Sequence, residues 1–145
     1  MATITGANAV LTLSVQDLFP SGVTIQGFST DDAFRSEAIT QAEILMGVDG
    51  ILSAGFVFNP YKMTIALQAD SPSVGIFEEI RLNQEASVDL FRIDGTIFLP
   101  GISTQYALTN GYMTSSFPFS DVKKVLQPRT VEITFQSITS EPSAI

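Results

Sequence analysis

The chain has 145 residues, and acidic residues outnumber basic ones by 15 to 7, which gives a formal net charge of −8. Apolar residues make up 45% and charged residues only 15%, so the length and composition suit one domain, residues 1–145, with a substantial core. Nucleic-acid affinity needs several positive contacts on one face. Because the basic residues cluster only at Lys123-Lys124, the composition argues against a surface that binds phosphates.

The chain contains no cysteine and no histidine. Disulfides, thiolate nucleophiles and zinc–thiolate sites are therefore excluded, and the commonest general base and metal ligand is missing. We expect no enzymatic activity, no cofactor and no metal. The first eight residues have neither the basic residues nor the apolar stretch of a secretory signal, and no run approaches the roughly 18 apolar residues that span a membrane. These features predict synthesis in the cytoplasm and no membrane insertion.

The first third of the chain reads as strands. Residues 9–15 and 23–28 alternate in polarity, and a turn-rich break at 19–22 separates them. Residues 36–46 are ambiguous, since their Ala and Glu content also suits a helix. The Asp49-Gly50 dipeptide favours a hairpin turn, so we predict a long strand over 36–46 that pairs with 51–58.

The middle of the chain predicts a third strand and a helix. Asn59-Pro60 forms a turn, and apolar residues then alternate over 63–67. Ser71 is a suitable N-cap, and Pro72 occupies a position where a helix has no use for its N–H. Val74 and Phe77 follow at helical spacing.

The last third returns to strands. Residues 88–99 are strand-like but interrupted at Asp94-Gly95, and Asn110-Gly111 predicts a hairpin between 104–108 and 112–117. Residues 130–138 show the cleanest alternation, and 138–145 are expected to form a loose tail. Together these elements predict a mainly β fold, an antiparallel β-sandwich or barrel with one flanking α-helix.

Two short motifs carry a resemblance to a known family. Gly47-Val48-Asp49-Gly50 precedes a strand, and the sequence Leu67-Gln-Ala-Asp-Ser-Pro-Ser73 leads into the helix. With the order of elements over most of the chain, this pattern resembles the tail tube proteins of contractile-tailed bacteriophages, which are related to type VI secretion and pyocin tube proteins.

The resemblance implies a structural protein of the virion tail. Six copies would form a ring in which strands of neighbouring copies join, and rings would stack into a tube inside a contractile sheath. The implied partners are further copies of the chain, the sheath, the baseplate and the tail terminator. DNA would pass through the tube without specific binding, because a strongly negative wall repels phosphates.

Two sets of residues are candidates for these roles. Alternation over 36–46 places Ala38, Ala42 and Ile44 toward the subunit's own core and a polar set toward a channel. The predicted channel-lining residues are Glu37, Gln41 and Glu43. The predicted ring-stacking residues are Val48, Asp49, Gly50 and Ile51 at the hairpin tip, together with the tail after Ser137.

Other functions compete with a tube subunit. A tail-terminator or baseplate-hub protein shares the fold, so fold alone does not separate them. A monomeric β-sandwich module that binds a ligand such as a carbohydrate is a second alternative, although the chain has no Trp and only three Tyr. A small enzyme is disfavoured by the missing histidine and cysteine.

Overall fold

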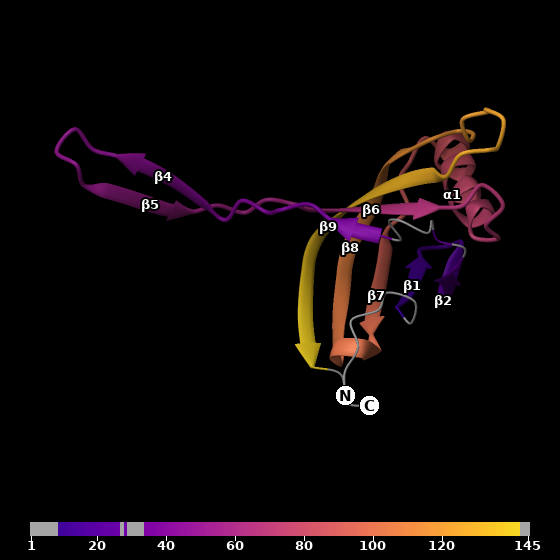
Figure 1. The fold of residues 1–145 in the computed structure, drawn as a ribbon, viewed down its shortest axis with the longest axis horizontal. Coiled ribbons are helices and arrows are strands. Elements are labelled where there is room, and N and C mark those ends of the chain that lie inside the picture. Colours follow the sequence, from indigo (N-terminus) through magenta and orange to yellow (C-terminus); the bar gives the residue numbers. More distant parts are fainter. Residues whose placement is uncertain (1–8, 27, 29–33, 143–145) are drawn as a thin grey trace.

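A computed structural model describes residues 9–26, 28 and 34–142. These residues form a seven-stranded antiparallel sheet, a separate two-stranded hairpin and one α-helix (Figure 1). The elements are β1 (Val10–Val15), β2 (Phe19–Ile25), β3 (Phe34–Ser36), β4 (Ala42–Met46), β5 (Leu52–Phe56), β6 (Tyr61–Leu67), α1 (Val74–Ser87), β7 (Ile93–Leu99), the 3₁₀ turn η2 (Pro100–Ile102), β8 (Thr104–Ser116) and β9 (Arg129–Pro142). The predicted mainly β, antiparallel fold with a flanking helix is confirmed, but the sheet does not close into a barrel.

The long strands β8 and β9 organise the sheet, whose strand order is β2-β1-β7-β8-β9-β6-β3. They have 13 and 14 residues and pair from Thr104–Pro142 to Ser116–Val131. β6 pairs only with the first half of β9, and its last pair is Tyr61 with Phe135. Residues 136–142 of β9 therefore pair with β8 on one side and with no described strand on the other.

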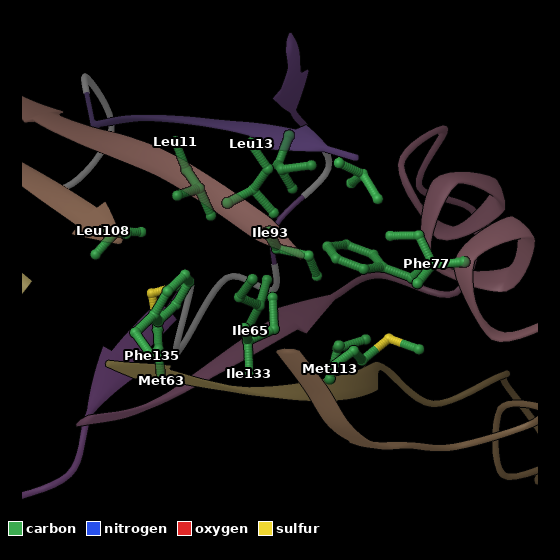
Figure 2. Close-up of a cluster of buried hydrophobic side chains, with 14 of the residues drawn as sticks. Leu11, Leu13, Met63, Ile65, Phe77, Ile93, Leu108, Met113, Ile133 and Phe135 are labelled. Carbon is green, nitrogen blue, oxygen red and sulfur yellow. The ribbon is translucent and has the colours of Figure 1, made fainter. Parts of the chain in front are cut away.

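The core lies between one face of the sheet and α1. Alternate residues of β1, β6 and β9 are buried, as expected for strands with one covered face. Phe77 and Ile80 of α1 complete the core, and Figure 2 shows Phe77 pointing toward Ile93 of β7. The buried apolar residues are Leu11, Leu13, Val15, Ile25, Met63, Ile65, Leu67, Phe77, Ile80, Ile93, Ile97, Leu108, Met113, Val131, Ile133 and Phe135.

Two buried serines attach the start of α1 to the end of β2. The Gln26 N–H donates to Ser73 Oγ at 2.7 Å, and Ser71 Oγ donates to the Gln26 carbonyl. Ser71 Oγ also accepts the Ser73 N–H at 3.2 Å. The residue before the helix is Ser73, not the predicted Ser71, and it makes no side-chain capping bond. These serines instead satisfy polar backbone groups that burial would leave unpaired.

The predicted hairpin at Asn110-Gly111 is wrong, because β8 runs straight through both residues. Asn110 adopts a left-handed conformation with φ of 52°, and Asp94 Oδ1 accepts its N–H at 2.8 Å. Its side-chain amide donates to Gln136 on β9 at 2.7 Å. Gly111 leaves space for the Phe135 ring, which a Cβ at that position would strike. The dipeptide therefore kinks a continuous strand instead of reversing it.

Several other boundaries differ from the sequence predictions. Residues 36–46 do not form one strand, since β3 ends at Ser36 and β4 begins at Ala42. The break predicted at 19–22 lies inside β2, where Gly22 has φ of 91° and the pairing with β1 shifts register. Residues 138–142 of the expected loose tail belong to β9. The helix continues to Ser87, so the strand predicted from residue 88 begins at Ile93.

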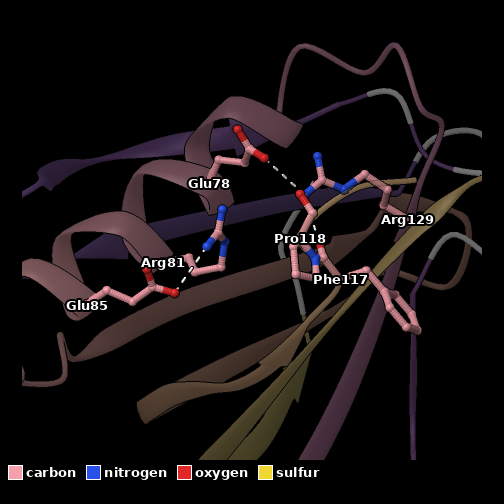
Figure 3. Close-up of polar contacts among 6 residues, drawn as sticks. All are labelled: Glu78, Arg81, Glu85, Phe117, Pro118 and Arg129. Carbon is pink, nitrogen blue, oxygen red and sulfur yellow. Dashed lines mark hydrogen bonds and ion pairs between the residues drawn. The ribbon is translucent and has the colours of Figure 1, made fainter. Parts of the chain in front are cut away.

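Arg129 fastens the β8–β9 connection to the helix (Figure 3). Its guanidinium donates to the carbonyls of Phe117 and Pro118 at 2.7 and 3.1 Å and to Glu78 Oε1 at 3.3 Å. The Arg129 side chain is only 13% exposed, although its partners Phe117, Pro118 and Glu78 are more accessible to water. Arg129 thereby ties together β9, α1 and the chain leaving β8.

We predict that Gly111→Ala lowers the free energy of unfolding by about 1–3 kcal/mol, because the new methyl group overlaps the Phe135 ring. The matched control is Gly75→Ala on α1, where an added Cβ meets no atom within 4 Å. It should leave stability unchanged or raise it by up to about 1 kcal/mol. Urea denaturation monitored by circular dichroism measures both. Equal effects of the two substitutions would contradict the packing role of Gly111.

We also predict that Arg129→Met lowers the free energy of unfolding by about 1–3 kcal/mol, because two carbonyls and Glu78 lose a shielded donor. Arg81→Met is the control. Arg81 makes only an i,i+4 pair with the exposed Glu85, and its buried Nε has no partner, so its loss should cost at most about 0.5 kcal/mol. Thermal and urea unfolding of the two variants test this difference.

Candidate assembly surfaces

The most exposed part of the described chain is a hairpin, residues 37–60, which we call the arm. Its two strands, β4 and β5, form a sheet of their own and project away from the seven-stranded sheet (Figure 1). Every residue of both strands is exposed. A two-stranded hairpin is at best marginally stable in water without a surface to pack against. The arm therefore lacks the support that the rest of the fold has.

The pairing of β4 with β5 gives the arm one entirely apolar face. Antiparallel partners share a face, and the register places Ile44 opposite Ala54. Ile44 is 56% exposed and Phe56 is 66% exposed. The other face carries Glu43, Leu45, Ser53 and Gly55. The apolar face consists of Ala42, Ile44, Met46, Leu52, Ala54 and Phe56.

The predicted turn at Asp49-Gly50 closes the arm. The Gly47 N–H donates to the Ile51 carbonyl at 2.8 Å, and the Gly50 N–H donates to the Gly47 carbonyl at 3.0 Å. Asp49 Oδ1 accepts the Ile51 N–H at 3.1 Å, and Gly50 has φ of 84°. The tip is thus an ordered turn in which Val48 and Ile51 are exposed.

Hydrogen bonds also join the two segments of the hairpin at the root of the arm, where neither segment is a regular strand. The Val57 N–H donates to the Gln41 carbonyl at 3.0 Å, and Asn59 Nδ2 donates to the Thr40 carbonyl at 2.8 Å. The rings of Phe56 and Phe58 meet edge to face at 4.9 Å. These contacts continue the hairpin as far as the seven-stranded sheet, so the arm leaves the domain as a ribbon of two paired segments.

The structure places all three predicted channel-lining residues on the arm. Glu37 follows β3, Gln41 lies at the root, and Glu43 lies in β4, all of them exposed. The expectation that Ala38, Ala42 and Ile44 pack on the subunit's own core is wrong, because all three are exposed on the arm. The residues of β4 do alternate between two faces of the hairpin, as predicted, but neither face packs on the core of the domain.

A groove runs beside the root of the arm, on the core side of the sheet. It has a volume of about 390 Å³. Its apolar lining comes from two sides. Strands β7, β8 and β9 contribute Ile97, Leu99, Tyr106 and Ile138, and β3, the arm root and β6 contribute Phe34, Ile39, Tyr61 and Met63. β6 pairs with the first half of β9, and β3 pairs with β6. Neither strand continues beside residues 136–142 of β9. The groove therefore borders the open edge of β9.

The opposite face of the sheet is polar and rich in hydroxyl groups. One row of paired residues crosses five strands and consists of Thr24, Thr12, Thr96, Ala107 and Thr139. The charges on this face are largely paired, as Lys62 with Glu132 at 3.7 Å and Arg92 with Asp94 at 2.9 Å. This face therefore presents no cluster of unpaired cations to a phosphate backbone.

Comparisons with known proteins identify the family. The family model described as tail fiber protein gp32 matches residues 2–139. The chain belongs to this family. No curated protein matches the chain significantly in sequence.

Solved structures show the same fold in contractile injection systems. A chain of the anti-feeding prophage baseplate matches with a TM-score of 0.64 at 11% identity, over all of both chains. A chain of the anti-feeding prophage tube-terminating cap matches with a TM-score of 0.54 at 16% identity, over 99% of this chain and 93% of the other. A chain of the PVC sheath/tube terminator in the extended state matches with a TM-score of 0.54 at 12% identity, over 97% and 98%.

These matches confirm the resemblance to contractile-tail proteins that the sequence carries. This gp32-family chain is a structural protein of the phage-tail type. Among the described residues, no cluster of acidic side chains could hold a metal ion. In the same part of the chain, α1 is neither long nor apolar enough to cross a bilayer, and no other helix meets that requirement.

Sequence reasoning found the hairpin but missed the surfaces that belong to it. The apolar face of the arm was readable, because a turn at Asp49-Gly50 places 42, 44 and 46 opposite 56, 54 and 52. The groove and the open edge of β9 were not readable. They depend on where β6 stops along β9, and this requires the register between two strands that lie far apart in sequence.

We predict that the double substitution Ile44→Ser and Leu52→Ser leaves the free energy of unfolding within about 0.5 kcal/mol of the parent, because both side chains are exposed in the described chain. Ile133→Ser, at a buried position of β9, should cost several kcal/mol by comparison. The arm variant should also bind less of the dye ANS. A large loss of stability in the arm variant would show that the arm packs on its own domain.

Proposed function

We propose that the chain is a structural subunit of a contractile tail and assembles with copies of itself at an end of the tube, as a baseplate or tube-terminating ring. The supporting observation is the arm, an ordered hairpin with an uncovered apolar face. It projects from a fold that baseplate, cap and terminator chains share. The proposal assigns the chain no enzymatic activity.

The physical argument for assembly is the amount of apolar surface that the chain leaves unburied. Contiguous exposed apolar patches on a soluble protein mark interaction sites, and an exposed strand edge is a template for pairing with another chain. The arm supplies the first, and β9 supplies the second. A contact between two different surfaces of identical chains generates a closed ring or an open stack.

A subunit of the tube body is the second candidate. The exposed tip residues Val48 and Ile51 favour it, because a rigid projecting turn could contact the next ring, as could Asp49 and Gly50 between them. In a tube, Glu37, Gln41 and Glu43 remain the proposed channel-lining residues, and the hydroxyl-rich sheet face is a second candidate wall. Either wall would let DNA pass without specific binding. The sheath, the baseplate and the terminator are the proposed partners in the virion tail.

Negative-stain electron microscopy of the purified chain, with light scattering on the same sample, tests the proposal. We expect single closed rings if the chain ends a tube and hollow tubes if it forms the tube body. The variant Ile44→Asp places a carboxylate on the apolar face of the arm and should weaken either assembly, raising the concentration needed by about tenfold or more while the fold is retained. A monodisperse monomer at every concentration, for the parent as well, would support the monomeric binding module instead.

A further inference from the structure

The apolar face of the arm, the groove and the open edge of β9 have complementary chemistry. We propose that the arm of a second copy of the chain lies in the groove and adds a strand to residues 136–142 of β9. This inference rests on the proposed self-assembly and states which two surfaces meet. It accounts for three uncovered features of the chain with one contact.

The open edge of β9 needs a strand as its partner, and the arm is the described segment that supplies one. The free edge of β2 is blunted, because Pro20 has no N–H and the shift in register at Gly22 leaves a short regular stretch. β3 has only three residues. β4 and β5 have five residues each, contain no proline and pair only with one another, so each keeps a free edge.

The side chains fit the same arrangement. Main-chain bonds give affinity when a strand is added to a sheet, and pockets for alternate side chains give specificity. The groove offers Ile97, Leu99, Tyr106 and Ile138 beside the edge of β9. An arm whose apolar face turns toward the groove would cover these side chains and its own six apolar residues together. The apolar face of the arm is exposed to water in the isolated chain, whereas in the groove Leu99, Tyr106 and Ile138 are partly exposed and Ile97 is buried.

Within one chain, the root of the arm lines the groove through Glu37 and Ile39, but the strands β4 and β5 are carried away from it. The hydrogen bonds at the root, between Gln41 and Val57 and between Thr40 and Asn59, continue the hairpin outward from the rim of the groove. β4 and β5 then extend far from the sheet (Figure 1). The contact therefore joins two copies, and because arm and groove are different surfaces, it propagates from copy to copy.

The charges are also complementary. The arm has no basic residue between 37 and 60, and beyond its root it carries Glu43 and Asp49; Glu37 already lines the groove of its own chain. Two cations lie at the rim of the groove, Arg35 and Lys62, and the strand register places both with Thr64 on the polar side of the sheet. Lys62 pairs with Glu132, whereas Arg35 is in no ion pair among the described residues. A carboxylate of the incoming arm would give Arg35 a partner at the rim, where such a contact fixes orientation more than affinity.

Crosslinking between copies tests the contact, and the absence of native cysteine makes it specific. Chains with Ala54→Cys and chains with Ile138→Cys carry tags of different size, are mixed before assembly and are treated with a bismaleimide that tolerates a small error in register. We expect a mixed dimer that survives denaturing electrophoresis. Glu79→Cys, exposed on α1, replaces Ile138→Cys as the control and should give none.

The outcomes separate this inference from the proposed function. Rings or tubes that form without an Ala54–Ile138 crosslink above the control would overturn the inference and leave the proposed function standing. Absence of any assembly in the parent chain would overturn both. Ile44→Asp should raise the concentration needed for assembly by about tenfold or more, whereas Leu45→Asp, on the opposite face of β4, should raise it less. Equal effects of the two substitutions would contradict the proposed orientation of the arm.

Discussion

The pairing of β9 with two strands of unequal length is the constraint on which the rest of the structure depends. β8 pairs with β9 from Val131 to Pro142, but β6 stops at Phe135, halfway along β9. The chain before β6 has no place in the sheet and leaves the domain as the arm. The second half of β9 keeps an open edge for the same reason. The arm and its proposed docking site are thus two consequences of one strand register.

The packing around Phe135 fixes that register. Phe135 is fully buried, lies opposite Gly111 and fills the space that the glycine leaves. Asn110 beside it holds the kink in β8 through Asp94 and Gln136. A slip of one residue would turn the apolar side chains of β9 to the polar face of the sheet. Buried packing and side-chain hydrogen bonds therefore hold β8 and β9 in one register close to the point where the arm leaves the domain.

The two ends of the domain differ in how they are completed. At the helix end, Ser71, Ser73 and Arg129 satisfy the polar groups that burial would leave unpaired, and the core is closed by Phe77. At the arm end, apolar side chains and a strand edge stay uncovered. A domain whose polar and apolar groups are covered at one end and uncovered at the other is suited to contact further copies of itself through the uncovered end.

The sequence by itself determined the element types and most of their positions. Period-two alternation identified β1, β6 and β9, and the Asp-Ser-Pro-Ser motif placed the helix, because these signals depend only on neighbouring residues. The same local rule failed at Asn110-Gly111, where a partner strand and a buried ring convert a turn dipeptide into a kink. It also failed for Ala38, Ala42 and Ile44, whose alternation says that a face is apolar but not what covers it. Only the tertiary structure decided where β6 ends along β9, and hence which surfaces remain open, because that register is set by contacts between residues about 70 positions apart.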